Sequence, residues 1–356
     1  MKPWYTLLLI SLCFQTVNAQ ILQLDWAKNN SGPGDNVGED IITDAAGNVY
    51  TVGTHTSNID LDPSAGIFFQ NSAGQEDIFI QKLDANGNFI WGKSIGGSGE
   101  DVATAIDIDA AGNLYITGFF ENTVDFDPGV GTFNVTSSGG WETFILKLNS
   151  AGNLVWVKTL VGQTNTFDRG QDLVLDNSGN VLICGFFNAT VDFDPGAGND
   201  FHSSVGLSDL YILKLDNAGN YVWAKTTGGN NIIRPNAVNI DQNDNIYITG
   251  YYIDTADFDP GLGISNLIPH PAFTSREIFV LKLDASGNYL WAESSYGPGS
   301  NRGIDIRIDE FGNSYIVGKF NDTVDVDPGP TVFNLTATSS SQNIFILKLN
   351  SQGNFI

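Results

Sequence analysis

Short segments in which apolar and polar residues alternate recur along the chain, and they predict β-strands joined by turns. Residues 102–109 (VATAIDID) alternate in this way, and residues 114–120 (LYITGFF) are rich in β-branched and aromatic residues. Between them, DAAGN at 109–113 is typical of a turn, because Asp accepts hydrogen bonds from the local backbone and Gly tolerates a positive φ. Residues 143–148 and 154–160 predict two more strands, joined by a second turn of the same kind.

This four-strand pattern occurs five times with a nearly constant period. The first turn of each copy begins at an aspartate, and successive copies begin 65, 67, 65 and 68 residues apart, at Asp44, Asp109, Asp176, Asp241 and Asp309. The second turn has the same D/N-x-x-G-N sequence and begins at Asp84, Asn149, Asp216, Asp284 and Asn350. Only one of the ten turns lacks its glycine, which Asp244 replaces. A fixed period of this length is typical of a repeat architecture.

The repeats predict an all-β fold, a β-propeller of four-stranded antiparallel blades with five repeats of about 66 residues visible. A β-helix would use much shorter coils, and separate sandwiches would need linkers, which the sequence lacks. The predicted repeat domain covers residues 20–356, with blades at approximately 36–97, 101–162, 168–228, 233–295 and 302–356.

Both ends of the repeat region carry parts of a fourth strand. Residues 22–29 contain the fourth-strand motif QLDWAK, and we expect them to form a closing strand that completes the last blade of the ring. Residues 353–356 (GNFI) begin another fourth strand and stop where a tryptophan is expected. These observations predict a truncated C-terminus, with further repeats or another domain beyond it.

The first 19 residues have the pattern of a signal peptide. Lys2 supplies the positive start, residues 7–14 form an apolar stretch too short to span a bilayer, and Val-Asn-Ala at 17–19 predicts cleavage after Ala19. We therefore expect a secreted or cell-surface protein with no transmembrane segment in the mature chain. Cys184 is then its only cysteine, so no internal disulfide can form, and a small buried side chain is the expected role.

The composition limits the partners. The 42% apolar content is ample for a large core, while 40 acidic and 16 basic residues give a net charge of −24. No cluster of Lys and Arg indicates a nucleic-acid site, and an acidic chain repels a polyanion or an anionic membrane. Cations are plausible partners, although the acidity can equally serve to keep an exported surface soluble.

Several motifs together resemble the bacterial β-propeller repeat family known as SBBP. They are WAK, GNLYITGFF, VDFDPG and FILKLN-x-x-GN, and the resemblance covers nearly all of residues 22–356. It implies an exported protein, of a kind often found in Bacteroidetes-like bacteria, and a seven-bladed ring that five repeats cannot fill. Members of the family often carry a C-terminal secretion or anchoring domain, which this sequence lacks. The resemblance supplies no catalytic residues.

The connection between the second and third strands of each repeat carries two aspartates in the motif D-x-D-P. In an up-and-down blade these long connections lie on the face opposite the tight turns, where binding residues often gather. Spaced carboxylates beside turn carbonyls suit Ca²⁺, the one cofactor indicated, although this ion wants more oxygens than the motif supplies. Alternatively the aspartates cap local turns or contact a ligand directly. The candidate calcium ligands are Asp60, Asp62, Asp125, Asp127, Asp192, Asp194, Asp257, Asp259, Asp325 and Asp327.

Signals for catalysis are weak. His55, His202 and His270 do not share a repeat position, and the sequence contains no HExxH, G-x-S-x-G or phosphate loop. The main hypothesis is an exported, non-catalytic scaffold that binds an extracellular protein or glycan through the long connections. The alternative is an extracellular glycan-active hydrolase or lyase, because paired carboxylates are abundant.

Asymmetry between repeats would favour the enzyme. The fourth repeat is the most irregular, with His270 and Arg276 in residues 265–277.

Aromatic residues at 119–120, 186–187 and 251–252 end the second strands of three repeats. They are expected to pack between blades or to stack on sugar rings.

Overall fold

Every regular element in the computed structural model is a β-strand. The structure describes residues 24–163, 166–269, 276–338 and 342–356. The predicted signal peptide at 1–19 therefore lies outside the described residues. In these ranges no helix is long and apolar enough to cross a membrane. The all-β prediction is confirmed.

Consecutive antiparallel strands form five similar groups, which we call units 1 to 5. Unit 1 contains β1 (Asn36–Thr43), β2 (Val49–His55), β5 (Asp77–Leu83) and β6 (Phe89–Gly97). Unit 2 contains β7 (Val102–Ile108), β8 (Leu114–Phe120), β11 (Gly140–Leu148) and β12 (Leu154–Thr159). Unit 3 contains β15 (Arg169–Leu175), β16 (Val181–Phe187), β19 (Asp209–Leu215) and β20 (Tyr221–Gly229). Unit 4 contains β21 (Ile232–Ile240), β22 (Ile246–Ile253), β25 (Glu277–Leu283) and β26 (Tyr289–Ser295). Unit 5 contains β27 (Arg302–Ile308), β28 (Ser314–Phe320) and β31 (Asn343–Leu349).

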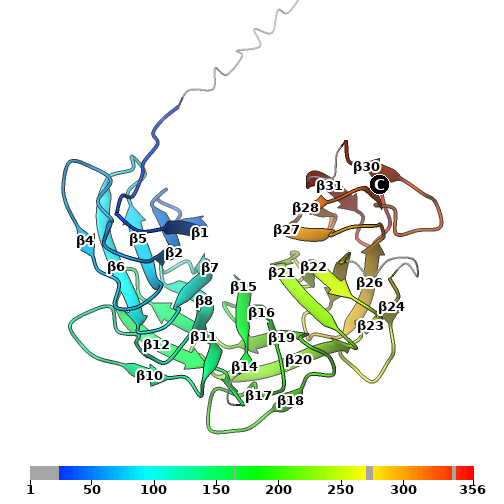
Figure 1. The fold of residues 1–356 in the computed structure, drawn as a ribbon, viewed down its shortest axis with the longest axis horizontal. Coiled ribbons are helices and arrows are strands. Elements are labelled where there is room, and N and C mark those ends of the chain that lie inside the picture. The colour runs from blue at the N-terminus through cyan, green and yellow to red at the C-terminus, as the bar shows by residue number, and fades with distance from the viewer. Residues whose placement is uncertain (1–23, 164–165, 270–275, 339–341) are drawn as a thin grey trace, which may run out of the picture.

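The units follow one another around an open arc (Figure 1). Their first strands, β1, β7, β15, β21 and β27, line its inner side, and each packs against the next. Within the described ranges the strands do not join into a closed sheet. β1 and β27 stand at the two ends of the inner row (Figure 1).

The expected closing strand is not a strand in the structure. Residues 24–30 have no regular pairing, but the Trp26 indole donates to the carbonyl of Ala85 in unit 1 at 3.1 Å. Tryptophans of later fourth strands bond to the next unit in the same way, at Asn217 and Ser351. Residues 24–30 thus occupy, against unit 1, the place of a preceding fourth strand, and their role in closing a ring stays a prediction.

The D/N-x-x-G-N turns have one repeated hydrogen-bond pattern. In the turn at 109–113, one Asp109 carboxylate oxygen accepts from the backbone N–H groups of Ala111 and Asn113, both at 2.9 Å. The other oxygen accepts from the Asn113 side chain at 2.8 Å. Gly112 has a φ of 82°, which explains the glycine. Asp244, which replaces it in unit 4, also adopts a positive φ of 59°.

A glycine in every second strand permits a close approach of the first strand. A Cβ atom at Gly118 would lie 1.8 Å from the carbonyl oxygen of Val102. The pairing of β7 with β8 is irregular between Ala103 and Ala105, which indicates a bulge in the first strand at this point. The equivalent glycines are Gly53, Gly185, Gly250 and Gly318.

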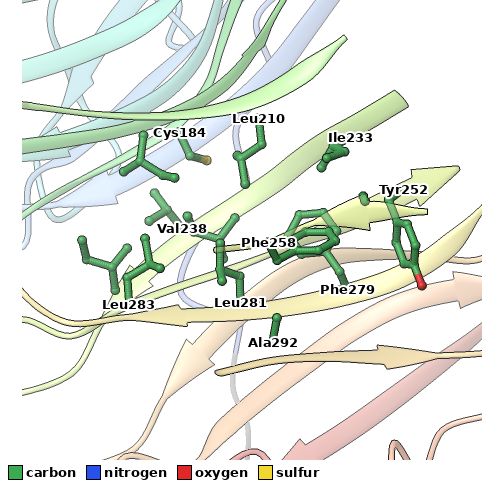
Figure 2. Packing of buried hydrophobic residues seen from close by; sticks show 14 of the residues in the cluster. Cys184, Leu210, Ile233, Val238, Tyr252, Phe258, Phe279, Leu281, Leu283 and Ala292 are labelled. Carbon is green, nitrogen blue, oxygen red and sulfur yellow. The ribbon is translucent and has the colours of Figure 1, made fainter. Parts of the chain in front are cut away.

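The hydrophobic core lies between successive units. Figure 2 shows the cluster between units 3 and 4, where Cys184 and Leu210 pack with Val238, Leu281 and Phe258. The Cys184 side chain is fully buried, which confirms its predicted role and raises the pKa of the thiol. Neighbouring units cover both surfaces of units 2 to 4, so β8, β16 and β22 are buried on both faces. In unit 5, at the end of the arc, β28 and β31 alternate buried and exposed residues.

Candidate functional site

The paired aspartates hold short hairpins together. One carboxylate oxygen of Asp125 accepts from the N–H groups of Asp127 at 3.1 Å and Phe133 at 2.7 Å. Asp127 in turn accepts from the N–H of Gly129 at 2.8 Å. The equivalent first aspartates, Asp60, Asp192, Asp257 and Asp325, each accept two N–H groups, and the second aspartates, Asp62, Asp194, Asp259 and Asp327, each accept one two residues further on. These contacts match the turn-capping interpretation.

The same hairpins join neighbouring units. Those of units 1 to 3 are β3 (Ile59–Asp60) with β4 (Phe69–Gln70), β9 (Thr123–Asp125) with β10 (Asn134–Thr136), and β17 (Thr190–Asp192) with β18 (Phe201–Ser203). Those of units 4 and 5 are β23 (Ala256–Asp257) with β24 (Asn266–Leu267), and β29 (Thr323–Asp325) with β30 (Asn334–Thr336). β9 pairs with β6, β23 with β20, and β17 with β13 (Val161–Gly162), so each of these hairpins is bonded to the preceding unit's end. The base of the long connection is therefore structural.

Calcium binding by these aspartates stays a prediction. No group of three or more His, Cys, Asp or Glu side chains among the described residues is arranged to hold a metal ion. In each hairpin, one carboxylate oxygen of each aspartate accepts backbone N–H groups of the same hairpin, as Asp125 and Asp127 do.

Further carboxylates connect the first strands at the centre of the arc. Asp40 accepts from the N–H of Ile106 in the next unit at 2.9 Å, and Asp172 accepts from that of Val238 at 2.8 Å. Both line a cavity of about 300 Å³ to which all five first strands contribute. Burial raises the pKa of Asp172 to about 8. These groups serve as ties between units.

The histidines do not form a common site. His55 is buried and hydrogen-bonds to the Ser57 carbonyl oxygen at 2.6 Å and the Ser94 hydroxyl at 2.9 Å. His202 of unit 3 lies 3.2 Å from a carboxylate oxygen of Asp200, two residues before it in the same connection. His270 is outside the described residues.

A different group of side chains departs from the repeat pattern. We call it the arginine–aromatic row, and it follows the long-connection ends of the first and second strands from unit 2 to unit 5. It consists of Phe119, Trp141, Phe167, Arg169, Phe186, Arg234, Tyr251, Arg276 and Arg302.

The row begins with an aromatic group at the joint between units 2 and 3. The Trp141 ring lies 4.4 Å from that of Phe119 and 5.3 Å from that of Phe167, measured between ring centroids. Residue 167 belongs to β14 (Thr166–Phe167), which pairs in parallel with β11. The Arg169 guanidinium lies over the Phe119 ring at 5.1 Å. One arginine of unit 3 thus covers an aromatic ring of unit 2.

Arginine and aromatic side chains continue to alternate at the next two joints. Arg234 of unit 4 lies 4.3 Å over the Phe186 ring of unit 3, and its Nε is 3.4 Å from the Ser208 hydroxyl. Arg276 lies 4.7 Å over the Tyr251 ring, and its backbone pairs with Ser300, next to the start of β27 at Arg302. Strand pairing connects the steps, because Arg169 is opposite Phe186 and Arg234 is opposite Tyr251.

The row carries positive charge without paired carboxylates. Among the described residues, none of its four arginines forms a salt bridge. Burial lowers the pKa of Arg169, while Glu39 across the centre favours its charged form. Glu142 follows Trp141 in the chain, and Glu277 follows Arg276. Their side chains are 2% and 0% exposed and accept backbone N–H groups. The guanidinium groups therefore have free donor capacity.

Sequence reasoning did not find this row, although a signal was present. All five arginines of the chain fall between residues 169 and 307. Three of them, Arg169, Arg234 and Arg302, occupy the same repeat position, seven residues before the first-turn aspartate. Units 1 and 2 have Val37 and Val102 there. Aligning the repeats at that position would have exposed the asymmetry.

Comparison with known proteins gives distant similarities. No protein-family model matches the chain, so the resemblance to SBBP repeats stays a prediction. An uncharacterized WD repeat-containing protein of Acanthamoeba polyphaga mimivirus is 24% identical over 270 residues. The match covers 67% of this chain and 19% of that protein, so it spans about a fifth of the relative's length.

Two solved structures are also similar. A protein of unknown function from Bacteroides caccae aligns with a TM-score of 0.37 and 10% identity, covering 90% of this chain and 80% of the other. The WD40 β-propeller domain of Doa1 aligns with a TM-score of 0.24 and 12% identity, covering 81% of this chain and 92% of the other. Similarities at this level carry no functional argument.

Proposed function

We propose that the chain is an exported β-propeller repeat scaffold that binds an extracellular protein or glycan without catalysing a reaction on it. The observation that carries this proposal is the arginine–aromatic row. Side chains that hold the units together recur in nearly every unit, whereas the row runs from unit 2 to unit 5 only. A departure from the repeat that leaves half-buried arginines without carboxylate partners is expected of a binding site, since architecture alone does not require it.

The propeller part of the proposal rests on the arrangement of the units. Antiparallel groups of four strands in units 1 to 4, and of three described strands in unit 5, follow one another around an arc, with the first strand of each on the inside (Figure 1). The similarity to a WD repeat-containing protein agrees with this arrangement. The number of blades and the closure of the ring are parts of the proposal.

The position of the proposed contact differs from the sequence expectation. The long connections were expected to bind the partner, but their D-x-D-P segments close hairpins and join units. The row instead lies where the connections begin, at the ends of β8, β16 and β22. Binding is therefore assigned to the inner end of the long-connection face.

Binding is favoured over hydrolysis by the state of the nearby acids. A glycosidase needs two carboxyl groups open to the substrate. Glu142 and Glu277, beside the row, are buried and hydrogen-bonded to the backbone. Both glutamates stabilise loop backbone, at Ser138 and Gly297, and neither is open to a substrate.

Export forms part of the proposal and rests on the signal-peptide pattern of residues 1–19. N-terminal sequencing of the protein secreted by a bacterial host tests it. We expect the mature chain to begin at Gln20, and retention of residues 1–19 would contradict export.

A glycan array, followed by a product-release assay on every polysaccharide that binds, tests the function. We expect binding with no release of oligosaccharides, and weaker binding by Arg234→Gln. Release of reducing ends above that of a heat-denatured control would overturn the non-catalytic assignment. Binding that Arg234→Gln leaves intact would separate the function from the row.

A further inference from the structure

We propose that the arginine–aromatic row binds an acidic polysaccharide, whose carboxylate or sulfate groups the arginines recognise at successive joints between units. The inference rests on the proposed function and names the class of ligand for the same site. It goes beyond the sequence expectation, in which the net charge of −24 repels polyanions.

The guanidinium groups of the row are oriented by aromatic rings. Arg169 and Arg234 lie over aromatic rings at 5.1 and 4.3 Å, so one flat face of each is occupied. Stacking leaves the N–H edge of a guanidinium free to donate in its plane, where carboxylate and sulfate oxygens fit in pairs. The rings beneath, Phe119 and Phe186, are only 3% and 5% exposed, which holds the stacks in place before a ligand arrives.

Two arginines of the row carry a donor without an acceptor. The Nε atoms of Arg169 and Arg302 are buried and have no hydrogen-bond partner. Buried donors are nearly always satisfied in folded proteins, because leaving one unpaired is costly. Arg169 pays an additional desolvation cost, as the lowering of its pKa indicates. Because these Nε atoms are closed off from solvent, an oxyanion bound at the row would accept from the terminal N–H groups of the half-buried guanidinium groups.

The local charge differs from the charge of the whole chain. Interactions between exposed charges are screened beyond roughly 8 to 10 Å at physiological salt, so the sign near the row decides binding. Burial raises the pKa of Asp168, next to Arg169, to about 7, and that of Glu277, next to Arg276, to about 8. These two acids are partly or largely uncharged near neutrality, and Glu39 is the exposed carboxylate that acts on Arg169.

The repetition of the row indicates a polymer as the ligand. Arginine–ring contacts cross the joints between units 2 and 3 and between units 3 and 4. Arg276 stacks within unit 4 and meets unit 5 through its backbone pairing with Ser300, and Lys319 lies opposite Arg302 in the register of unit 5. A chain with one charge per sugar can meet such sites in turn, which adds affinity through multivalency. At the other end, Phe167 is 49% exposed beside Trp141, and aromatic faces of this kind pack against sugar rings.

The experiment is isothermal titration of the whole chain with matched polymers. Polygalacturonate is compared with its methyl ester, and dextran sulfate with dextran, so that charge and sulfate are each tested separately. Polyglutamate and a single-stranded oligonucleotide represent other polyanions. Arg169→Gln, Arg234→Gln and Arg276→Gln are compared with Lys158→Gln, which removes the same charge on the tight-turn face, next to Gly219. Circular dichroism confirms the fold of each variant, and three separate arginines keep the test valid if one variant fails to fold.

We expect an acidic polysaccharide to bind and its neutral counterpart to bind at least tenfold more weakly. Each arginine variant should lose about tenfold or more in affinity, the usual effect of removing a hydrogen bond to a charged group, whereas Lys158→Gln should lose less than threefold. Equal binding of the neutral polymers, unchanged binding by the arginine variants, or equal binding of polyglutamate or the oligonucleotide would each overturn the inference. Row-dependent binding of a neutral glycan would leave the proposed function standing alone. Cleavage of an acidic glycan bound at the row would overturn the non-catalytic function and leave the assignment of the ligand class standing.

Discussion

Lys214 shows how one repeat position is filled by two kinds of interaction. In the other units the equivalent lysine lies 4.6 to 4.8 Å over a tyrosine ring, at Tyr50, Tyr115, Tyr247 and Tyr315. Unit 3 has Leu182 in place of the tyrosine, and Lys214 pairs with Asp176 at 2.8 Å, closer than the 3.9 Å between Lys282 and Asp241 in unit 4. The sequence predicts lysines that cover apolar surface and meet nearby aspartates. The sequence does not show which of these partners each lysine contacts, and the side-chain distances in the structure do.

Two glycines separate conformational cost from steric cost. Gly179 has a φ of 78° with nothing within 4 Å of its Cβ direction, so Gly179→Ala should cost about 1 kcal/mol for the left-handed conformation alone. Gly118→Ala places a Cβ 1.8 Å from the Val102 carbonyl oxygen and should lower the thermal unfolding midpoint several times more. Calorimetry measures both. Equal shifts would contradict the proposed close approach of the strands.

The arginine–aromatic row marks what the sequence left unpredicted at this scale. The aromatic residues at 119–120, 186–187 and 251–252 were recognised, and their first expected use, packing between units, agrees with the 3%, 5% and 6% exposure of Phe119, Phe186 and Tyr251. Their arginine partners come from other strands or from the next unit, about 25 to 50 residues away in the chain. Contacts of that separation leave no local sequence pattern.

At the scale of elements, turns and strands could be predicted and the hairpins could not. The turn motif determines its own hydrogen bonds within five residues, and alternation determines which face of a strand is buried. The pairing of β9 with β6 depends instead on how one unit sits against the preceding one. The D-x-D-P segment consequently left calcium binding and turn capping as open alternatives.

Asp125 distinguishes these two alternatives. Its carboxylate oxygen accepts two backbone N–H groups, which an amide oxygen can also do, so Asp125→Asn should change the unfolding midpoint little. Asp125→Ala leaves both donors unpaired and should cost about 1 to 2 kcal/mol. Thermal unfolding at zero and millimolar Ca²⁺ measures both variants. A calcium-dependent rise in midpoint that Asp125→Asn abolishes would show that metal binding was the better interpretation.

At the scale of the whole molecule, acids buried between and beside units link stability to pH. Burial raises the pKa of Asp101 to about 7 and those of Asp172 and Glu277 to about 8. In the unfolded chain such groups titrate near about 4. The folded state therefore holds protons that the unfolded state has lost, and stability decreases as pH rises from about 4 through 8.

We accordingly expect a higher unfolding midpoint at pH 5.5 than at pH 8.0, measured at constant ionic strength. Glu277→Gln cannot titrate, so its midpoint should fall less over this range than that of the unmodified chain. A midpoint that rises with pH, or an unchanged slope in Glu277→Gln, would contradict the assignment of these buried acids.

The arrangement of units in an arc could be predicted from the period, because four strands per copy cannot bury their surfaces without neighbours. The closed ring was not obtained from the described chain, in which β1 and β27 end the inner row (Figure 1). Between these ends, aspartates recur where first strands are hydrogen-bonded to the next unit, as at Asp40 and Asp172. The residues of the arginine–aromatic row differ from unit to unit. The central claim is that architecture and binding use different positions of one repeat.

Hydrogen–deuterium exchange of the whole chain, with and without polygalacturonate, tests this claim most directly. The account predicts slower exchange at the beginnings of β15, β21 and β27 and at β14, with no change in the D/N-x-x-G-N turns. Protection confined to those turns, or spread equally over all five units, would contradict it.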